Sequence, residues 1–362
     1  MAPGFPPTLG GVERHVAELA VRAARAGWTV EVLAQDGERR PTVATERGVT
    51  IRRFPSIVPS KTFPFAPGLF AHLRRHQGDW AIVHAHNYHS LPALGAALTR
   101  HGRLVFTPHY LGSGDSASRR LLHGVYARPG RLIFERAAHV ICVTQTEAGA
   151  VQESFGVAQS RISVIPNGID VDAIRAGEPF PTDSLVVLSA GRLESYKNVD
   201  LAVRALAHLD DRFVLAVAGD GPARAALEAL AANLGLTPRV RFLGRLDSAT
   251  LNRWYRTARV YVSMSGRECF GITLLEALAA GASVVAADTP VHREVLASVA
   301  QANVELVPTG SPAPALADAL RSAALRRRAT GATRPLSWDD VASRTLDVYS
   351  SLLGSPGQAS AA

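Results

Sequence analysis

The segment Leu185-Val-Val-Leu-Ser-Ala190, with the amphipathic stretch after it and then Phe213-Val-Leu-Ala-Val-Ala218, is typical of a parallel βαβ unit. Two short apolar runs rich in valine flank a helical stretch, and parallel strands need such a crossover between them. The same alternation continues through the second half of the chain. The further strands expected there are Val240–Leu243, Val260–Ser263, Ser283–Ala286 and Val304–Val307. The pattern predicts a parallel sheet with helices between its strands.

The first half repeats this alternation. The strands expected in it are Trp28–Ala34, Val49–Phe54, Trp80–His84, Arg103–Thr107, His139–Val143 and Ile162–Ile165. A helix is expected over Gly11–Ala26, because its apolar residues recur on one face and a glycine follows it. The turn-rich segment Pro166–Asp170 divides the two halves. We expect two Rossmann-like α/β domains, at residues 1–168 and 169–335, and a last helix at 336–353 that returns to the first domain.

The beginning of the chain departs from this plan. A doubly wound domain normally opens with a buried strand that leads into its first glycine-rich turn. Only nine residues precede Gly10 here and three of them are prolines, which cannot donate to a central ladder. We therefore expect the first strand to be missing, with a gap in the middle of the first sheet. We also predict that the natural start codon lies upstream of Met1.

Composition narrows the class of protein. The chain has 362 residues, enough for two domains, and its 47% hydrophobic and 19% charged residues exclude a disordered chain. No apolar run reaches the roughly 18 residues of a membrane span, and the N-terminus lacks the pattern of a signal peptide. Two cysteines exclude a disulfide framework. We expect a cytoplasmic protein.

The net charge of +8 is concentrated in the first half, where residues 1–170 carry 19 basic against 12 acidic residues. Either an acidic partner or a solvated basic surface explains this excess. The stretch Ser118–Arg131 mixes cations with apolar residues and suits peripheral contact with an anionic surface at the inner face of a membrane. Pro129-Gly130 is expected to interrupt a long helix there, which favours a solvated loop. Nucleic acid is not expected, because the basic stretches lack interleaved aromatic residues.

The strongest candidate site is Glu268-Cys-Phe-Gly-Ile-Thr-Leu-Leu-Glu276, two carboxylates around an expected strand-to-helix turn. Ionised carboxylates accept hydrogen bonds from hydroxyl groups, and free N–H groups at a helix start receive anions. A polyhydroxylated, anionic ligand would suit both features. An alternative explanation covers Glu276 alone, since Thr273-Leu-Leu-Glu276 has the spacing of a capping box.

A second candidate, Gly191-Arg-Leu-Glu-Ser-Tyr-Lys197-Asn, follows the first strand of the second half and would emerge at the carboxyl end of its sheet. Arg192 offers a fork for phosphate oxygens and Lys197 a point charge. The chain has only two lysines, so this one suggests a function, although an ordinary solvated loop is the alternative. Gly219-Asp-Gly-Pro222 is a weaker signal, mainly of a turn.

Histidines end two strands of the first half. His84, His86 and His89 could suggest a metal site, but no cysteine or carboxylate clusters with them, and no metal is expected. His109 follows Thr107-Pro108 at the same carboxyl edge and is the better active-site candidate. A hydrogen-bonded turn histidine is its alternative explanation.

Four blocks in this order resemble glycosyltransferase family 4, from Pro7 to about Leu352. They are Pro7-Thr-Leu-Gly-Gly-Val-Glu-Arg-His-Val16, Val164-Ile-Pro-Asn-Gly-Ile-Asp170, Gly191-Arg-Leu with Lys197-Asn, and Glu268 to Glu276 followed by Gly281. Members of this family are retaining enzymes of the GT-B fold, whose two domains face a cleft, and they use nucleotide-sugars. The resemblance implies a hexosyltransferase that needs a UDP or GDP type of donor, a hydroxyl acceptor and no metal cofactor.

The resemblance also implies roles for single residues. Arg192 and Lys197 would hold the donor diphosphate with the backbone around Gly10 and Gly11, and His109 would lie beside the anomeric carbon. Glu268 would accept hydrogen bonds from sugar hydroxyls and Glu276 from the ribose. The remaining donor-binding residues that it implies are Arg245 and Leu246 near the base, and Phe270, Gly271, Ile272 and Thr273 along the sugar and phosphate.

Two residues depart from the family pattern, and two rival functions stay open at this point. Cys269 stands where a small residue such as glycine is more usual, and His292 is also unusual, so the preferred donor is not defined. The rivals are another GT-B enzyme, such as a sugar-nucleotide epimerase or a phosphorylase, and a non-catalytic basic protein that binds anionic lipid or nucleic acid. The Glu268–Glu276 block favours the transferase.

Overall fold

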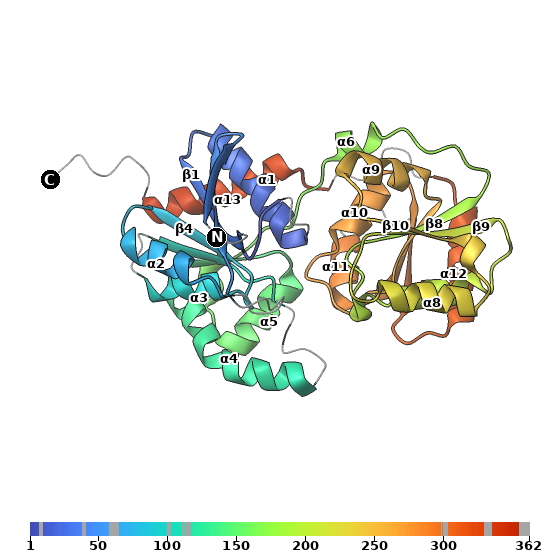
Figure 1. The fold of residues 1–362 in the computed structure, drawn as a ribbon, viewed down its shortest axis with the longest axis horizontal. Helices are drawn as coiled ribbons and strands as arrows, with labels where there is room; N and C mark the ends of the chain where they lie inside the picture. The colour runs from blue at the N-terminus through green and yellow to red at the C-terminus, as the bar shows by residue number, and fades with distance from the viewer. Residues whose placement is uncertain are drawn as a thin grey trace. The chain divides into compact units, whose positions relative to one another are not determined.

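The computed structural model describes residues 1–6, 10–37, 41–57, 65–99, 103–110, 112, 117–297, 299, 303–328 and 335–354. Its contacts divide the chain into two units, each with strands and helices of its own (Figure 1). The first unit contains Met1–Asn167 and Trp338–Ala362, and the second contains Gly168–Ser337. Residues Leu336 and Ser337, expected in the last segment, therefore belong to the second unit.

The second unit is built on one parallel sheet of six strands in the order β10-β9-β8-β11-β12-β13. Its strands are β8 (Leu185–Ala190), β9 (Phe213–Ala218), β10 (Val240–Gly244), β11 (Val260–Ser263), β12 (Ser283–Asp288) and β13 (Val304–Pro308). Its α-helices are α6 (Val171–Arg175), α7 (Val199–Leu206), α8 (Arg224–Asn233), α9 (Ser248–Thr257), α10 (Ile272–Ala279), α11 (Pro290–Ala297) and α12 (Ala313–Leu325). Short 3₁₀ turns span Ser195–Lys197 and Thr237–Arg239. The predicted parallel sheet is confirmed, and all six residues of β9 are buried, as a strand covered on both faces should be.

The first unit has its strands in two sheets, one of three strands in the order β1-β3-β2 and one of four in the order β4-β5-β6-β7. The strands are β1 (Val30–Gly37), β2 (Thr42–Glu46), β3 (Val49–Pro55), β4 (Ile82–His86), β5 (Arg103–Thr107), β6 (His139–Cys142) and β7 (Ile162–Val164). The helices are α1 (Gly11–Arg25), α2 (Pro67–Arg75), α3 (Leu91–Leu98), α4 (Ala117–Arg136), α5 (Gln145–Phe155) and α13 (Trp338–Leu353), with a 3₁₀ turn at Gln159–Arg161.

Met1 and Ala2 lie where the expected gap falls. The Ala2 N–H donates to the Leu33 carbonyl of β1 (3.1 Å), the Met1 amino group donates to the His84 carbonyl of β4 (2.6 Å), and the His86 N–H donates to the Met1 carbonyl (3.1 Å). Two residues thus satisfy backbone groups of both sheets, in the position between β1 and β4.

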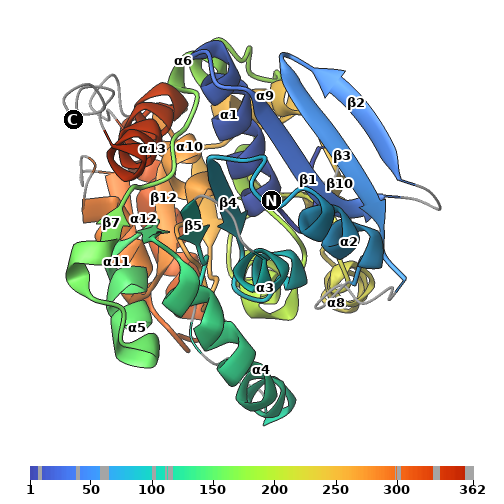
Figure 2. The same ribbon diagram turned by 90° about the vertical axis from the view of Figure 1, so that its left-hand side faces the viewer.

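Strand β2 is the element that sequence patterning missed. It pairs antiparallel with β3 at the edge of the sheet, and all five of its residues are exposed (Figure 2). A strand with no buried face carries no alternation of apolar and polar residues, which is the signal that indicates strands elsewhere in this chain.

Helix α4 corrects the prediction that Pro129-Gly130 interrupts the chain. The helix is continuous over Ala117–Arg136 with Pro129 inside it, although an interior proline removes one hydrogen bond and costs about 3 kcal/mol. Ile133 and Phe134 are fully buried in the core that includes Tyr88, and this packing outweighs the penalty. Gly130 permits the packing, because a Cβ there would lie 2.4 Å from the Tyr88 hydroxyl oxygen.

Helix α13 packs against α1, so the end of the chain belongs to the first unit. Arg22 of α1 forms an ion pair with Asp339, and the rings of Trp28 and Tyr349 meet edge to face at 5.6 Å between centroids. The buried ring of Trp338 begins the helix. Both helices are amphipathic, and each buries its apolar face against the other elements of the unit.

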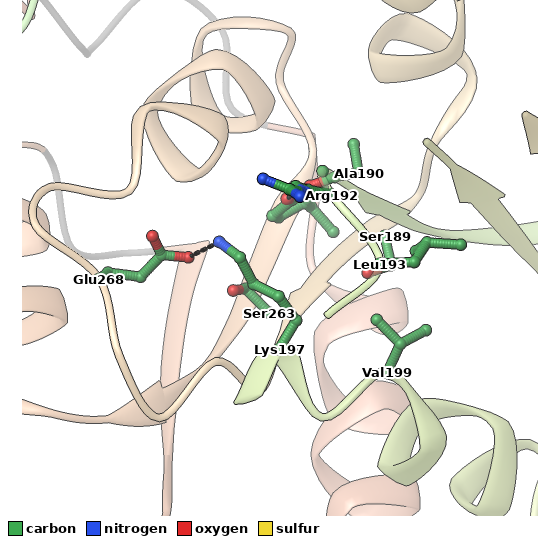
Figure 3. Close-up of a pocket in the computed structure, with 10 residues that line it drawn as sticks. Ser189, Ala190, Arg192, Leu193, Lys197, Val199, Ser263 and Glu268 are labelled. Carbon is green, nitrogen blue, oxygen red and sulfur yellow. Dashed lines mark hydrogen bonds and ion pairs between the residues drawn. The ribbon is translucent and has the colours of Figure 1, made fainter. Parts of the chain in front are cut away.

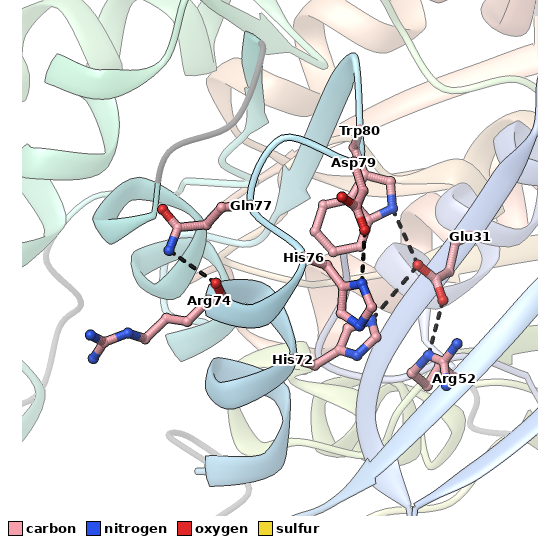
Figure 4. Close-up of polar contacts among 8 residues, drawn as sticks. All are labelled: Glu31, Arg52, His72, Arg74, His76, Gln77, Asp79 and Trp80. Atoms are coloured by element: carbon pink, nitrogen blue, oxygen red, sulfur yellow. Dashed lines mark hydrogen bonds and ion pairs between the residues drawn. The ribbon is translucent and has the colours of Figure 1, made fainter.

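A polar cluster joins α2 to β1 and β3 in the first unit (Figure 4). Glu31 accepts hydrogen bonds from Arg52 Nε at 2.9 Å and from the Trp80 indole at 3.2 Å, and His76 Nδ1 lies 2.8 Å from a carboxylate oxygen of Asp79. The rings of His72 and His76, one helical turn apart, have centroids 4.2 Å apart. The bonds from Arg52 and Trp80 satisfy a half-buried carboxylate, and His72 Nε2 of α2 lies 3.9 Å from the same carboxylate, which joins the helix to the sheet.

Candidate functional site

The loop after β8 carries the first group of candidate residues. The chain turns at Gly191, continues through the 3₁₀ turn Ser195–Lys197, and enters α7 through Asn198, whose φ is +50°. The Asn198 side-chain amide donates to the Met264 carbonyl at 2.9 Å, and the Gly266 N–H donates to the Tyr196 carbonyl at 3.1 Å. The loop after β8 is therefore bonded to the loop after β11, its neighbour in the sheet.

Two glycines bring a second loop directly against this one. A Cβ at Gly219 would lie 1.9 Å from the Gly191 carbonyl oxygen, and one at Gly221 would lie 2.4 Å from the Leu193 carbonyl oxygen. The Leu193 N–H donates to the Asp220 carbonyl (3.1 Å), and the Ala223 N–H donates back to the Leu193 carbonyl (3.0 Å). The segment that sequence analysis treated as a plain turn thus supports the backbone on both sides of Arg192.

A pocket at the carboxyl end of β8 and β11, which we call the Lys197 pocket, gathers three of the predicted residues (Figure 3). It is lined by Ser189, Ala190, Gly191, Arg192, Leu193, Lys197, Val199, Tyr261, Ser263 and Glu268. Lys197 Nζ donates to Glu268 Oε1 at 2.5 Å, with about a fifth of each side chain exposed. The two sequence blocks therefore meet at one ion pair.

Arg192 lines the same pocket and is the more exposed of its two cations. Its Nε is 2.9 Å from Glu194 Oε1, and 52% of its side chain is exposed, so its guanidinium remains accessible to a ligand. The Tyr261 hydroxyl donates to the Ala190 carbonyl at 3.0 Å, and burial raises the pKa of this phenol, so it stays a donor. The lining of the pocket therefore includes two cations and one carboxylate.

Helix α10 places the second carboxylate. The helix begins at Ile272, and its N-cap is Gly271 with φ +87°, so Thr273 lies in the first turn and is not the capping residue. The capping-box explanation of Glu276 is therefore wrong. Glu276 is 2% exposed and accepts a hydrogen bond from the Tyr255 hydroxyl at 2.9 Å. Because the N-cap Gly271 has no side chain, no side-chain cap bonds the first N–H groups of α10, and those of Ile272 and Thr273 are left for other acceptors.

The remaining predicted residues of the second unit lie along the same edge. Phe270 is buried, Ile272 and Thr273 open α10, and Arg245 and Leu246 follow β10, where the Gly219 N–H donates to the Gly244 carbonyl at 2.7 Å. Arg245 is exposed.

His292, noted as unusual in sequence, is fully buried behind the turn at Gly271. Its Nδ1 is 2.7 Å from the Ala287 carbonyl oxygen, so that nitrogen carries a proton. Burial lowers the pKa of His292 and keeps it neutral. Cys269, the other departure, is half-buried in the loop between Glu268 and Phe270.

His109 lies in the first unit, two residues beyond β5, with a φ of +47° that is rare for a residue with a side chain. It belongs to a group of four imidazoles, which we call the histidine cluster: His15, His84, His86 and His109. The ring pairs in contact, His15–His86, His15–His109, His84–His86 and His86–His109, have centroids 4.1 to 6.0 Å apart. Burial lowers the pKa of His109 to about 3 and lowers that of each of the other three, so the cluster is neutral.

Glu147, which sequence analysis missed, supports this loop. Its buried carboxylate accepts hydrogen bonds from the backbone N–H of Tyr110 at 2.6 Å and of Val143 at 2.7 Å. Glu147 stands three residues after Thr144, the N-cap of α5, whose hydroxyl accepts from the Glu147 N–H. The Thr-x-x-Glu spacing signals a helix start, but only the fold brings Tyr110 to it.

Gly10 and Gly11 begin α1 in the first unit, and both are exposed. A Cβ at Gly10 would lie 2.0 Å from a carboxylate oxygen of Glu13, which folds back over the helix start. Pro7, Thr8 and Leu9, which open the first sequence block, lie outside the described residues.

Comparison with known proteins assigns the family. The model of Glycosyltransferase Family 4 matches residues 9–173, and that of Glycosyl transferases group 1 matches residues 170–330. A D-inositol 3-phosphate glycosyltransferase of Xylanimonas cellulosilytica is 31% identical, over 94% of this chain and 91% of that protein. One from Streptomyces avermitilis is 30% identical, over 95% and 83%. The chain belongs to glycosyltransferase family 4.

Solved structures agree on the fold of this family 4 glycosyltransferase. Sucrose-phosphate synthase from Thermosynechococcus elongatus superposes with a TM-score of 0.77 at 21% identity, with 97% of each chain covered. Anabaena HepE, solved with UDP and glucose, gives a TM-score of 0.75 at 18% identity over 97% of this chain and 98% of that one. The expected GT-B fold is confirmed.

The function class is confirmed as well: the family 4 glycosyltransferase moves a sugar from a nucleotide-sugar to a hydroxyl acceptor. Within the part of the chain that the structure describes, no three His, Cys, Asp or Glu side chains are grouped so that they could hold a metal ion. The same part contains no helix with the length and apolar character of a membrane span.

Proposed function

We propose that this glycosyltransferase uses a UDP-sugar, retains the anomeric configuration of the sugar, and transfers it to a hydroxyl group of a small phosphorylated acceptor of the inositol phosphate type. The UDP bound to HepE supports the choice of base, and the names of the curated relatives support the acceptor. The +7 charge of residues 1–170 suits an anionic acceptor. Among the donors expected from sequence, UDP is therefore preferred to GDP.

One observation carries the proposal: Arg192, Lys197 and Glu268 line a single pocket at the carboxyl edge of a parallel sheet. Ligands of open α/β folds bind at this edge. Arg192 and Lys197 can bind the oxygens of a diphosphate, and the carboxylate of Glu268 can accept hydrogen bonds from sugar hydroxyls. A basic protein that only binds anionic lipid or nucleic acid would have no use for the carboxylate.

Further residues extend the donor site along the sheet edge. Glu276 would accept the ribose hydroxyls, and Arg245 with Leu246 would lie beside the uracil. Phe270, Gly271, Ile272 and Thr273 would line the sugar and phosphate, where the free N–H groups at the start of α10 favour an anion. Gly10 and Gly11 would offer backbone N–H groups from the first unit, and His109 would back the reacting sugar.

The transfer follows from these roles. The bond between C1 of the sugar and the phosphate oxygen breaks, and its electron pair leaves with the diphosphate, whose charge Arg192 and Lys197 stabilise. The acceptor oxygen forms its bond to C1 on the same face. The proton of the acceptor hydroxyl passes to the departing phosphate oxygen. Because Arg192 and Lys197 stabilise the negative charge that develops on the diphosphate, the reaction is expected to proceed without a metal ion.

The decisive test of the pocket is Lys197→Ala. Removal of one charge that stabilises the transition state should lower kcat about 10²–10³-fold, measured by steady-state transfer from UDP-glucose. Arg204→Ala is the matched control, because Arg204 forms an exposed pair with Asp200 at 3.8 Å in the same unit and should keep its activity. Unchanged turnover in Lys197→Ala would refute the diphosphate role.

Donor and acceptor are tested separately. Thermal shift with UDP and with GDP should show stabilisation by UDP, since ligand binding raises Tm by mass action. Product analysis with labelled UDP-sugars should show transfer to inositol 3-phosphate and not to inositol, with the anomeric configuration of the donor retained. Transfer to inositol alone would contradict the phosphorylated acceptor.

Peripheral contact with an anionic membrane remains a prediction. Helix α4 is continuous, as such contact would require, but the side chains of residues 117–125 lie outside the described set. Flotation with anionic liposomes at low and high salt should recover the protein only at low salt if its basic first half holds the surface.

A further inference from the structure

The chain passes between its two units twice, at Asn167–Gly168 and at Ser337–Trp338. The two connections are paired with each other: the Ile169 N–H donates to the Leu336 carbonyl at 2.9 Å, and Ile169 forms a parallel bridge with Ser337. Paired connections cannot move independently, so any change of angle between the units is concentrated in the few residues beside them.

Both connections end on one side chain, His15 of α1. Its Nδ1 lies 2.7 Å from the Asn167 side-chain oxygen, and its ring meets the Trp338 ring edge to face at 5.8 Å between centroids. His15 and Trp338 are each 2% exposed and Asn167 is 6% exposed. Because an amide oxygen accepts hydrogen bonds, Nδ1 of His15 carries the proton. A buried bond of this kind is costly to leave unmade.

The same imidazole also contacts the candidate catalytic histidine. The ring of His15 is perpendicular to that of His109 with 5.5 Å between centroids, and it lies 5.3 Å from the ring of His86. His109 Nε2 is buried and has no hydrogen-bond partner among the described residues. With no hydrogen bond at Nε2 among the described residues, the orientation of the His109 ring at that atom depends on packing. The ring of His15 is one of the groups that pack against it.

We propose that His15 is a positioning residue, which couples the two connections between the units to the imidazole of His109. Movement of Asn167 and Trp338 shifts the ring of His15, and the ring of His109 follows. The inference rests on the proposed function in one respect, the place of His109 beside the reacting sugar. It adds that the geometry of His109 responds to the connections between the units.

Two variants separate the contacts of His15. His15→Phe keeps a ring against Trp338 and His109 but leaves the Asn167 oxygen unpaired, whereas His15→Asn keeps a donor near Nδ1 and loses the ring. His139→Asn is the control, because His139 is a half-buried histidine of the same unit that bonds to Ser163 Oγ at 2.8 Å. Each is compared by kcat for transfer and by the Kd for UDP from calorimetry.

Coupling predicts that His15→Phe and His15→Asn each lower kcat about tenfold, since a displacement well below 1 Å at the reacting centre has effects of this size. The Kd for UDP should change much less than kcat, because the side chains proposed to hold UDP, those of Arg192, Lys197 and Glu276, lie in the second unit. The proposal would be overturned if the His15 variants lost no more kcat than His139→Asn does. It would also be overturned if their loss of kcat only followed the loss of folded protein.

The double variant His15→Phe/His109→Asn decides whether His15 acts through His109. Groups that act through one another are non-additive, so His15→Phe should lower kcat no further once His109 is replaced. Additive losses would refute the coupling. His109→Asn alone tests the proposed function. Full activity of this variant would show that His109 has no role in the reaction, and the effects of the His15 variants on kcat would still be measured independently of it. Should His15→Phe not fold, His15→Asn takes its place in the same cycle.

Discussion

The polar centre of the second unit is charged, and that of the first is neutral. In the Lys197 pocket, Lys197 pairs with Glu268 and Arg192 with Glu194. In the histidine cluster, burial lowers the pKa of all four imidazoles, so that none carries a charge at neutral pH. Both centres include residues at the carboxyl ends of parallel strands, so a position at this edge of a sheet does not explain the difference.

The difference matches the charges that the proposed reaction develops. The diphosphate leaves with negative charge, which paired cations can stabilise by exchanging a carboxylate partner for phosphate oxygens. The sugar carbon becomes positive, and an imidazolium beside it would oppose that change, whereas a neutral imidazole does not. With the residue roles proposed above, each unit would supply the electrostatics suited to one side of the bond that breaks.

Beyond the loss expected for Lys197→Ala, the largest effect is expected in the loops of the second unit. In Gly221→Ala the new Cβ would meet the Leu193 carbonyl and displace the backbone beside Arg192. A shift of about 1 Å at a binding loop can cost about 10²-fold in kcat/KM, measured with the donor varied. Gly266→Ala is the control, since its Cβ has no neighbour closer than 3.9 Å. Equal activity of both variants would show that the pocket tolerates movement of this loop.

A smaller effect, on stability, is expected in the first unit. Gly130→Ala would drive a Cβ into the buried Tyr88 ring and should lower the free energy of unfolding by about 1–3 kcal/mol. Gly149→Ala in α5, where nothing lies within 4 Å, should raise it by about 0.5–1 kcal/mol. Chemical denaturation measures both. A neutral Gly130→Ala would mean that α4 does not depend on this contact.

The pH dependence of stability tests whether the histidine cluster is neutral. The pKa of His109 is about 3 in the folded unit against 6.5 ordinarily, so the unfolded chain binds its proton first as the pH falls. Stability is full above about pH 6.5 and is lost between that value and pH 3, at up to about 1.4 kcal/mol per pH unit for this group.

His109→Asn removes this titrating group, and asparagine tolerates the positive φ. Denaturation between pH 7 and pH 4 should therefore show a shallower loss of stability in this variant than in the wild type. His208→Asn, at an exposed histidine, is the control and should follow the wild type. Parallel curves for all three proteins would mean that the pKa of His109 is the same in the folded and the unfolded chain.

The smallest effect is expected from removing metal ions. The proposed function gives the cations of the Lys197 pocket the place of a metal at the leaving diphosphate, and it predicts that transfer measured in EDTA equals that measured without it. Inactivation by EDTA that Mg²⁺ reverses would show that transfer needs a metal ion in addition to the cations of the Lys197 pocket.

Much of the second unit follows from local pattern. Strands β8, β9 and β11 begin and end where the apolar runs do, because the burial of a parallel strand leaves a continuous signal in the sequence. The same reasoning failed at β2, whose residues are all exposed, and at Pro129, where packing of α4 outweighs the local preference. Local signals are decisive only where no distant contact opposes them.

The candidate site divides in the same way. Residues of the right chemistry at strand ends, such as Arg192, Lys197 and Glu268, can be found from spacing alone, because the ends of parallel strands meet at one edge. The contacts of Glu147 with Tyr110, and of His15 with Asn167 and Trp338, join residues up to 323 positions apart. Such contacts depend on how helices and loops pack, and packing is a property of the whole chain. The candidate site residues could therefore be recognised from the order of the residues alone. The residues that hold them in place could be recognised only from the tertiary structure.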